Sequence, residues 1–149
     1  MLNQYQDVFR CLKKHEVRYV VIGGIAAVLH GVPRATFDLD LLVEATLENV
    51  TRLLDALVEA KLGTATLTTP ERVLANEITI FKDRLRIDVQ TKTPGLDFAD
   101  AWVRRETMRH RDQEFYVVTV ADLIASKKAA GREVYLADVR ALETPHRND

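Results

Sequence analysis

The fold is decided by residues 20–43, which read VVIGGIAAVLHGVPRATFDLDLLV. The apolar run 19–22 predicts a short buried strand that ends at the glycine pair 23–24. Residues 25–30 then predict one or two turns of helix, and residues 36–43 predict a second strand. A strand, a glycine turn, a short helix and another strand in this order indicate a sheet with helices packed against it.

Two aspartates, Asp38 and Asp40, interrupt the second strand. Strand side chains alternate between faces, so both carboxylates point to one face and the apolar residues around them point to the other. Aspartate is a poor strand former and like charges on one face repel, so this arrangement predicts a positive charge that compensates the two carboxylates. Asp88 repeats the pattern between Ile87 and Val89 in the predicted strand 85–91. If the two strands are neighbours, the three carboxylates converge on one point.

Three converging carboxylates predict a site for hard divalent cations, because Mg²⁺ takes oxygen ligands from carboxylates and substrate phosphates. Two such ions about 3.5–4 Å apart clamp the attacking and leaving oxygens of a phosphoryl displacement. Gly23 and Gly24 fit the same chemistry, since a glycine turn before a helix leaves backbone N–H groups free for phosphate. The turn is not a Walker loop, because no Gly-Lys-Ser/Thr follows it, and Gly31 has the wrong spacing for a dinucleotide fingerprint.

The remaining chain supplies further helices and strands. Amphipathic periodicity, caps and breaks predict helices at residues 2–12, 47–58 (with Thr46 as N-cap and Gly63 as stop), 70–75, 98–105, 121–130 and 136–142. Apolar runs predict strands at residues 78–81 and 85–91, joined as a hairpin, and at 115–119. We therefore expect a mixed α/β (α+β) fold in one domain over residues 1–149. Its core is expected at about 15–92 and a helical C-terminal part at about 96–145.

Composition limits the location and the partners. Cys11 is the only cysteine, which excludes an internal disulfide and a thiolate metal cage. The net charge of -1 excludes a global field that attracts polyanions, so contact with nucleic acid would need a local basic patch. No stretch is apolar enough for a signal peptide or a membrane span, so we expect a cytoplasmic protein without membrane contact.

The spacing of the glycines and aspartates resembles the signature of the DNA polymerase beta-type nucleotidyltransferase superfamily. That signature is a hydrophobic residue, Gly-Gly or Gly-Ser, a spacer and Asp-hydrophobic-Asp, with a third carboxylate on a later strand. The matching residues here are Gly23, Gly24, Asp38, Asp40 and Asp88. The chain is similar to small stand-alone bacterial members related to abortive-infection toxins and toxin–antitoxin pairs.

The resemblance is close from residue 19 to about 91 and looser in the tail. The segment 123–132 is similar to the tail helix of the superfamily. Asp138 also matches, whereas Val134 and Tyr135 stand where a lysine and an aspartate are expected. These replacements leave the three carboxylates untouched.

The resemblance implies transfer of a nucleoside monophosphate from a nucleoside triphosphate to an acceptor hydroxyl, with pyrophosphate leaving. It implies that Asp38 and Asp40 hold two Mg²⁺ ions, with Mn²⁺ as an alternative, and that Asp88 binds one ion and helps to deprotonate the acceptor. Gly23 and Gly24 would face the triphosphate. The implied acceptor is tRNA, a hydroxyl of a partner protein or a small molecule such as an aminoglycoside. The short chain favours a homodimer or a partner protein that completes the site.

Several residues near the signature have two interpretations. Arg34 and Thr36 either bind phosphate or satisfy the strand entry and the nearby carboxylates. Lys127 either lies near the triphosphate or belongs to a solvated helix face. The basic run 104–111 either meets RNA phosphates or is ordinary surface, and no Tyr or Phe is interleaved with it to stack on bases. Trp102 is expected in the core or at its margin.

Two other functions stay open. A non-catalytic protein-binding module would keep the fold, although the presence of all three carboxylates argues against it. A metal-dependent phosphohydrolase would use the same carboxylates with water as the nucleophile, although the glycine turn argues against it. The identity of the product separates the three functions.

Overall fold

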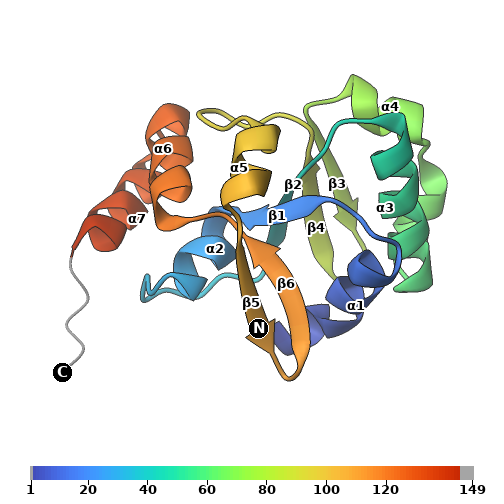
Figure 1. Ribbon diagram of the computed structural model, residues 1–149, viewed down its shortest axis with the longest axis horizontal. Helices are drawn as coiled ribbons and strands as arrows, with labels where there is room; N and C mark the ends of the chain where they lie inside the picture. The colour runs from blue at the N-terminus through green and yellow to red at the C-terminus, as the bar shows by residue number, and fades with distance from the viewer. Residues whose placement is uncertain (1, 145–149) are drawn as a thin grey trace.

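The computed structural model describes residues 2–144, in which six strands form one mixed sheet (Figure 1). The strands are β1 (Tyr19–Ile22), β2 (Leu39–Val43), β3 (Ile78–Lys82), β4 (Arg86–Gln90), β5 (Glu106–His110) and β6 (Gln113–Val117). Their order across the sheet is β3-β4-β2-β1-β6-β5. β1 is antiparallel to β2 and parallel to β6, and β2 is parallel to β4. Strands that are distant in sequence therefore pair in the middle of the sheet.

Helices pack around this sheet. They are α1 (Gln6–Lys14), α2 (Gly23–Leu29), α3 (Leu47–Glu59), α4 (Pro70–Ala75), α5 (Phe98–Arg104), α6 (Val120–Ala130) and α7 (Glu133–Glu143), with 3₁₀ turns η1 (Leu2–Tyr5) and η2 (Gly63–Leu67). α3 packs on α1 and α4, whereas α2 packs on β1, β2 and α6. Figure 1 shows α6 and α7 at one end of the molecule and α3 and α4 at the other. This arrangement confirms the expected α/β class.

Apolar side chains of the central strands form the core. Every residue of β1 is buried, and in β2 only Asp40 is not fully buried. Phe9 of α1 stacks on Phe115 of β6, with 4.6 Å between ring centroids. Because close-packed interiors deform little, the sheet gives rigid support to the polar side chains at its margin.

The predicted N-cap at Thr46 and the break at Gly131 are confirmed, whereas Gly63 does not stop α3, which ends at Glu59, and instead begins η2. The hydroxyl of Thr46 accepts a hydrogen bond from the backbone N–H of Asn49 and caps α3. α6 ends at Gly131, whose φ of 70° is left-handed, as a glycine C-cap allows. None of the helices within residues 2–144 has both the length and the apolar character to cross a membrane.

The second predicted strand is shorter than expected. β2 begins at Leu39, so residues 36–38 lie outside the sheet. The reason is that β1 ends at Ile22, opposite Asp40, and the chain then turns at Gly23 directly into α2. Residues 36–38 therefore have no β1 backbone to pair with.

Much of the basic run 104–111 lies in strand β5, which the sequence did not predict, and most of that strand is exposed. β5 and β6 form a hairpin in which His110 pairs with Gln113, so the loop consists of Arg111 and Asp112. Both loop residues have positive φ, 49° and 65°. Two-residue hairpin loops of this kind usually carry Asn-Gly or Asp-Gly, so Arg-Asp gives no clear turn signal. The strand predicted at 115–119 is β6, which begins two residues earlier, at Gln113, because the turn at Arg111 and Asp112 starts it there.

Candidate active site

The side chains of Asp38, Asp40 and Asp88 line one cavity of about 310 Å³. Parallel pairing of β2 with β4 places Asp40 directly opposite Asp88, and residues in this relation share a face of the sheet. The carboxylates of Asp38 and Asp88 both pair with the guanidinium of Arg86. Gly24, Arg34 and Thr36 line the same cavity. The structure thus brings together the three carboxylates and part of the segment between the glycine pair and Asp38.

A tyrosine on the first turn positions the segment that carries Asp38. The hydroxyl of Tyr5 donates to the backbone carbonyl of Phe37 and lies 3.2 Å from the carbonyl of Arg86. It thereby ties the residue before Asp38 to the strand that carries Asp88. Burial raises the pKa of Tyr5 to about 12, and the charge of Asp38 acts in the same direction, so the phenol stays protonated. The sequence offered no signal for this role.

Burial strongly affects the carboxyl group of Asp40. Burial, together with the negative charges of Asp88 and Asp38, raises its pKa to about 7. Lys127 opposes the shift. A carboxyl group in this state binds a proton until a cation compensates its charge, which is the behaviour of a divalent metal ligand.

The positively charged guanidinium of Arg86 lies between the carboxylates of Asp38 and Asp88. Its Nε lies 3.0 Å from Asp88 Oδ1 and 3.6 Å from Asp38 Oδ2, and one terminal nitrogen lies 3.3 Å from Asp88 Oδ2. Within residues 2–144, no three His, Cys, Asp or Glu side chains are already arranged as metal ligands. The guanidinium explains this, because carboxylate oxygens turned toward an arginine do not all face one ion.

The chemistry of the donors nevertheless fits divalent metal. Three carboxylates at one point are hard oxygen ligands, and the arginine between them shows that the position favours positive charge. A Cβ atom at Gly23 would lie 2.1 Å from Asp40 Oδ2, so the glycine leaves the space that this carboxylate needs. Asp38, Asp40 and Asp88 are the residues that would hold the ions.

We expect Arg86→Gln to tighten Mg²⁺ binding, because the variant removes the cation that competes for Asp38 and Asp88. Both ion pairs are partly exposed, so the gain should be modest, about two- to fivefold. The midpoint of the rise in melting temperature with Mg²⁺ concentration measures it. Arg72→Gln on α4 is the charge-matched control. An unchanged or higher Mg²⁺ midpoint in Arg86→Gln would show that the guanidinium does not compete with metal.

The glycine pair makes room for two different groups. Gly23 has a left-handed φ of 70° and is packed against Asp40. A Cβ at Gly24 would lie 2.8 Å from Thr36 Oγ1 and 3.0 Å from a terminal nitrogen of Arg34. The pair is therefore more than a turn: it allows the start of α2 to approach both the carboxylates and the cationic side of the cavity.

Gly23→Ala and Gly131→Ala form a matched test of this packing. Both glycines have a φ of 70°, but no atom of residues 2–144 lies within 4 Å of a Cβ at Gly131. Both variants should lose about 1–2 kcal/mol from the left-handed backbone. Only Gly23→Ala should also displace Asp40 and lose the Mg²⁺-dependent rise in melting temperature. If Gly23→Ala kept that rise, the space beside Asp40 would be irrelevant to metal binding.

Lys127 is buried, so its interpretation as part of a solvated helix face is wrong. The side chains of Lys127 and Asp138 are each 3% exposed, and Lys127 Nζ lies 2.9 Å from Asp138 Oδ2. Arg34 donates two hydrogen bonds of 2.9 Å to the same carboxylate. Asp138 of α7 thus joins Arg34 from the segment before β2 to Lys127 of α6. Burial lowers the pKa of Lys127, and its hydrogen bond to Asp138 opposes that effect.

A second cavity, of about 200 Å³, adjoins the first. The two cavities share Asp40, Arg132 and Tyr135, and the second also reaches Gly23 and Lys127. It is the more apolar of the two in character, since leucine, isoleucine, proline and alanine side chains contribute to its wall. Asp40 therefore stands at the boundary between a charged cavity and a more apolar one.

The sequence did not predict the contacts that Arg86 and Tyr135 make with the charged side chains of this site. Arg86 lies two positions before Asp88, and this i, i+2 spacing on a strand could have identified a partner on the same face. Tyr135 packs 4.2 Å from Lys127 Nζ, and the hydroxyl accepts a hydrogen bond from Arg132. The contact between Lys127 and Tyr135 depends on how α7 folds back on α6, so no local pattern indicated it, whereas Arg132 and Tyr135 are only three residues apart.

A mixed sheet with a glycine turn and three carboxylates at one cavity is consistent with a nucleotidyltransferase domain. The chain belongs to the DUF6036 family, described as "Nucleotidyltransferase of unknown function", whose model matches residues 2–147. Membership implies an enzyme that acts on a nucleotide, and it suggests divalent metals in general. No curated protein matches the sequence.

Proposed function

We propose that this protein transfers a nucleoside monophosphate from a nucleoside triphosphate to an acceptor hydroxyl, with Asp38, Asp40 and Asp88 as ligands of two metal ions. The observation that carries the proposal is the pairing of Asp40 opposite Asp88 beside the glycine turn. Mg²⁺, or Mn²⁺ in its place, would neutralise phosphate charge and clamp the attacking and leaving oxygens when bound. The resemblance to DNA polymerase beta-type enzymes supports the same reaction.

In the proposed reaction the acceptor oxygen forms a bond to the α-phosphorus, and the bond from that phosphorus to pyrophosphate breaks. Asp88 accepts the proton of the acceptor hydroxyl. Arg34 and Arg132 line the carboxylate cavity and bind the phosphates, which withdraws the charge that develops on the leaving group. Thr36, also in the wall, and Lys127, in the adjoining cavity, complete the polar surroundings of the nucleotide. Catalysis then depends on position and charge rather than on a covalent enzyme intermediate.

The acceptor that we propose is a macromolecule, either tRNA or a hydroxyl of a partner protein, within a toxin–antitoxin system. Ile80 of β3 pairs opposite Asp88, so it lies on the same face, and it is exposed, as is Ile78. β3 is an edge strand, so a second molecule can reach this apolar surface beside the carboxylates. A homodimer or a partner protein that covers it would complete the site.

Incubation with each α-³²P-labelled nucleoside triphosphate in turn, in Mg²⁺ or Mn²⁺, tests the function. The reactions contain tRNA, total cell protein or no acceptor, and wild type is compared with Asp40→Asn. Label on RNA or protein that depends on Asp40 supports the proposal and identifies the acceptor. Free labelled monophosphate alone would identify a phosphohydrolase. If wild type and Asp40→Asn behaved identically with every triphosphate and acceptor, the result would favour a non-catalytic protein-binding module.

A further inference from the structure

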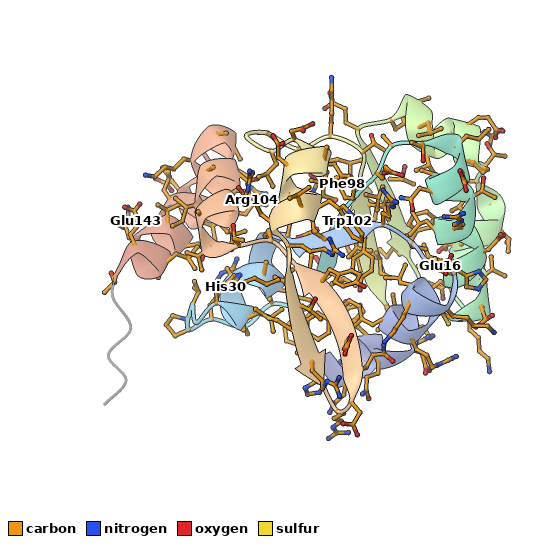
Figure 2. The ribbon with its side chains drawn as sticks, in the orientation of Figure 1. Glu16, His30, Phe98, Trp102, Arg104 and Glu143 are labelled. Carbon is orange, nitrogen blue, oxygen red and sulfur yellow. The ribbon has the colours of Figure 1, made fainter. Side chains whose placement is uncertain are left out.

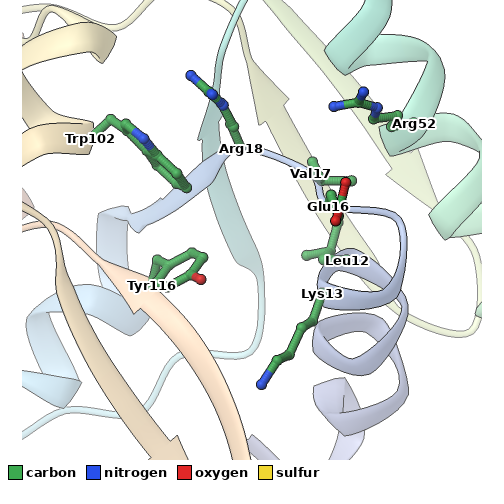
Figure 3. Close-up of a pocket in the computed structure, with 8 residues that line it drawn as sticks. All are labelled: Leu12, Lys13, Glu16, Val17, Arg18, Arg52, Trp102 and Tyr116. Carbon is green, nitrogen blue, oxygen red and sulfur yellow. The ribbon is translucent and has the colours of Figure 1, made fainter.

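A third cavity, of about 320 Å³, is lined by Arg18 just before β1 (Figure 3), whereas Asp40 pairs with Ile22 at the other end of that strand. We call it the Trp102 pocket and define it by Lys13, Glu16, Arg18, Arg52, Trp102 and Tyr116, which line it. Arg18 directly precedes β1 and Gly23 directly follows it, so about 13 Å of strand separates the two regions. Among residues 2–144, none lines both this pocket and a cavity of the candidate active site. Its volume is at the lower end of the range, about 300–1,000 Å³, that is usual for small-ligand sites.

Two aromatic rings form one wall of the Trp102 pocket. Trp102 of α5 and Tyr116 of β6 meet edge to face, with 5.3 Å between centroids. The guanidinium of Arg105 lies 3.6 Å from the centre of the indole and 4.7 Å from that of the phenol, and it donates to the backbone carbonyl of Trp102. Arg105 does not line the pocket, so it supports the rings from outside. Figure 2 shows Trp102 on α5 beside Phe98, which stacks on it at 5.8 Å.

Three basic side chains from different elements face the aromatic wall. Lys13 belongs to α1, Arg18 precedes β1, and Arg52 belongs to α3. Figure 3 shows them around the same opening as Trp102 and Tyr116, with Glu16 as the one acidic side chain among those drawn. Arg18 is 5.8 Å from the centre of the indole, a contact loose enough to yield to a flat ligand.

The basic side chains also have acidic partners, which lie outside the wall. Lys13 pairs with Glu114, Arg18 with Glu44, and Arg52 with Glu48, and none of these glutamates lines the pocket. The basic side chains are 40–62% exposed, so these ion pairs are weak and can rearrange. The wall itself carries three positive charges and one negative charge.

We propose that the Trp102 pocket binds a nucleotide unit, with its base against Trp102 and its phosphate among Lys13, Arg18 and Arg52. Aromatic rings with nearby guanidinium groups stack on any base, while basic side chains hold the phosphate. An uncharged aromatic ligand would leave the three cations unused, and a cationic one would be repelled. The unit is either a free nucleotide or an unpaired nucleotide of an RNA strand. This inference is independent of the activity at the carboxylates.

The only tryptophan in the chain is in this pocket, so its fluorescence reports on ligand binding directly. The probes are adenosine, AMP and a short single-stranded RNA, added in EDTA to wild type and to Asp40→Asn, with free N-acetyltryptophanamide as the optical control. AMP or the RNA should quench Trp102 equally in both proteins, and adenosine should bind more weakly. Quenching by RNA alone identifies a strand as the ligand, and quenching by AMP identifies a nucleotide. The proposal would be overturned if neither AMP nor the RNA quenched Trp102, or if adenosine bound as tightly as AMP. Loss of the quenching in Asp40→Asn would overturn it as well.

Two neighbouring lysines allow a matched test of the phosphate contact. Lys13 and Lys14 are equally exposed, 62%, but Lys14 pairs with Glu59 and does not line the pocket. Lys13→Gln should weaken binding about two- to fivefold, and Lys14→Gln should leave it unchanged. Glu16→Gln should strengthen binding, because it removes the negative charge from the wall. Equal effects of the two lysine variants, or weaker binding by Glu16→Gln, would contradict a phosphate site.

Discussion

Asp40→Asn is expected to abolish nucleotidyl transfer while making the metal-free protein more stable at neutral and higher pH. The loss of activity should be about a thousandfold or more, because the variant removes a charged ligand at the point where phosphate charge must be compensated. Asparagine has nearly the shape of a protonated aspartate, so it fits the space beside Gly23 without forcing a charge into a buried position.

The gain in stability follows from the raised pKa of Asp40. The folded protein holds a proton on this carboxyl group up to a pKa of about 7, whereas the ordinary value is 3.8. Between these values the folded state binds more protons than the unfolded state, so the free energy of unfolding falls as the pH rises. The free energy of unfolding of Asp40→Asn does not fall in this way. Above pH 7 the variant should therefore be more stable than wild type by on the order of 2–4 kcal/mol.

Thermal melts in EDTA from pH 4 to pH 8, with and without added Mg²⁺, measure both effects. The difference between variant and wild type should grow with pH in EDTA and shrink in Mg²⁺, since only wild type gains stability from the ion. Asp112→Asn is the control, because Asp112 is fully exposed in the β5–β6 turn. Active Asp40→Asn would exclude the carboxylate from catalysis, and a variant less stable than wild type at pH 8 would show that Asp40 is not destabilised by burial.

The two-residue spacing of Asp38 and Asp40 is a local property, so their approach to one cavity could be predicted even though Asp38 lies just before β2. Placing Asp88 beside them needed only the assumption that two strands are neighbours, and the register of β2 with β4 meets it. The Arg34–Asp138–Lys127 contacts could not be predicted in this way. They join three segments that meet only when α7 packs on α6 and α6 packs on α2.

The aromatic wall of the Trp102 pocket shows a second limit of sequence reasoning. No Tyr or Phe is interleaved with the basic run along the chain, which argued against base stacking there. Arg105 nevertheless contacts Tyr116, because the hairpin folds β6 back beside the end of α5. The turn at Arg111 and Asp112 that makes this possible carries no glycine, so the pairing was hidden.

Asp138→Asn is expected to cost about 3–5 kcal/mol of stability, because it leaves a buried cation and a partly buried one without their common anion. Lys127 is almost completely buried and pairs with Asp138 at 2.9 Å, and Arg34 makes a bidentate contact with the same group. At roughly 2–4 °C per kcal/mol for a chain of this size, the melting temperature should fall by on the order of 10 °C. Thermal melts at pH 7 measure the difference.

Asp122→Asn is the matched control for Asp138→Asn. Asp122 makes a similar bidentate pair with Arg104, but Arg104 is 52% exposed and can return to water when its partner is lost. This variant should therefore cost no more than about 1 kcal/mol. If Asp122→Asn and Asp138→Asn proved equally destabilising, burial of the cation would not be the cause.

The dependence on pH and a second substitution separate charge from shape at Asp138. Burial alone would raise the pKa of Asp138, but Arg34 and Lys127 hold it below its ordinary value. The stability from this group is therefore present at neutral pH and is lost as the pH falls through its folded pKa, so wild type and Asp138→Asn should converge in acid. Adding Lys127→Met to Asp138→Asn should recover part of the lost stability, because the uncompensated buried charge is gone. A double variant less stable than Asp138→Asn alone would show that Lys127 stabilises the fold through packing and not through its charge.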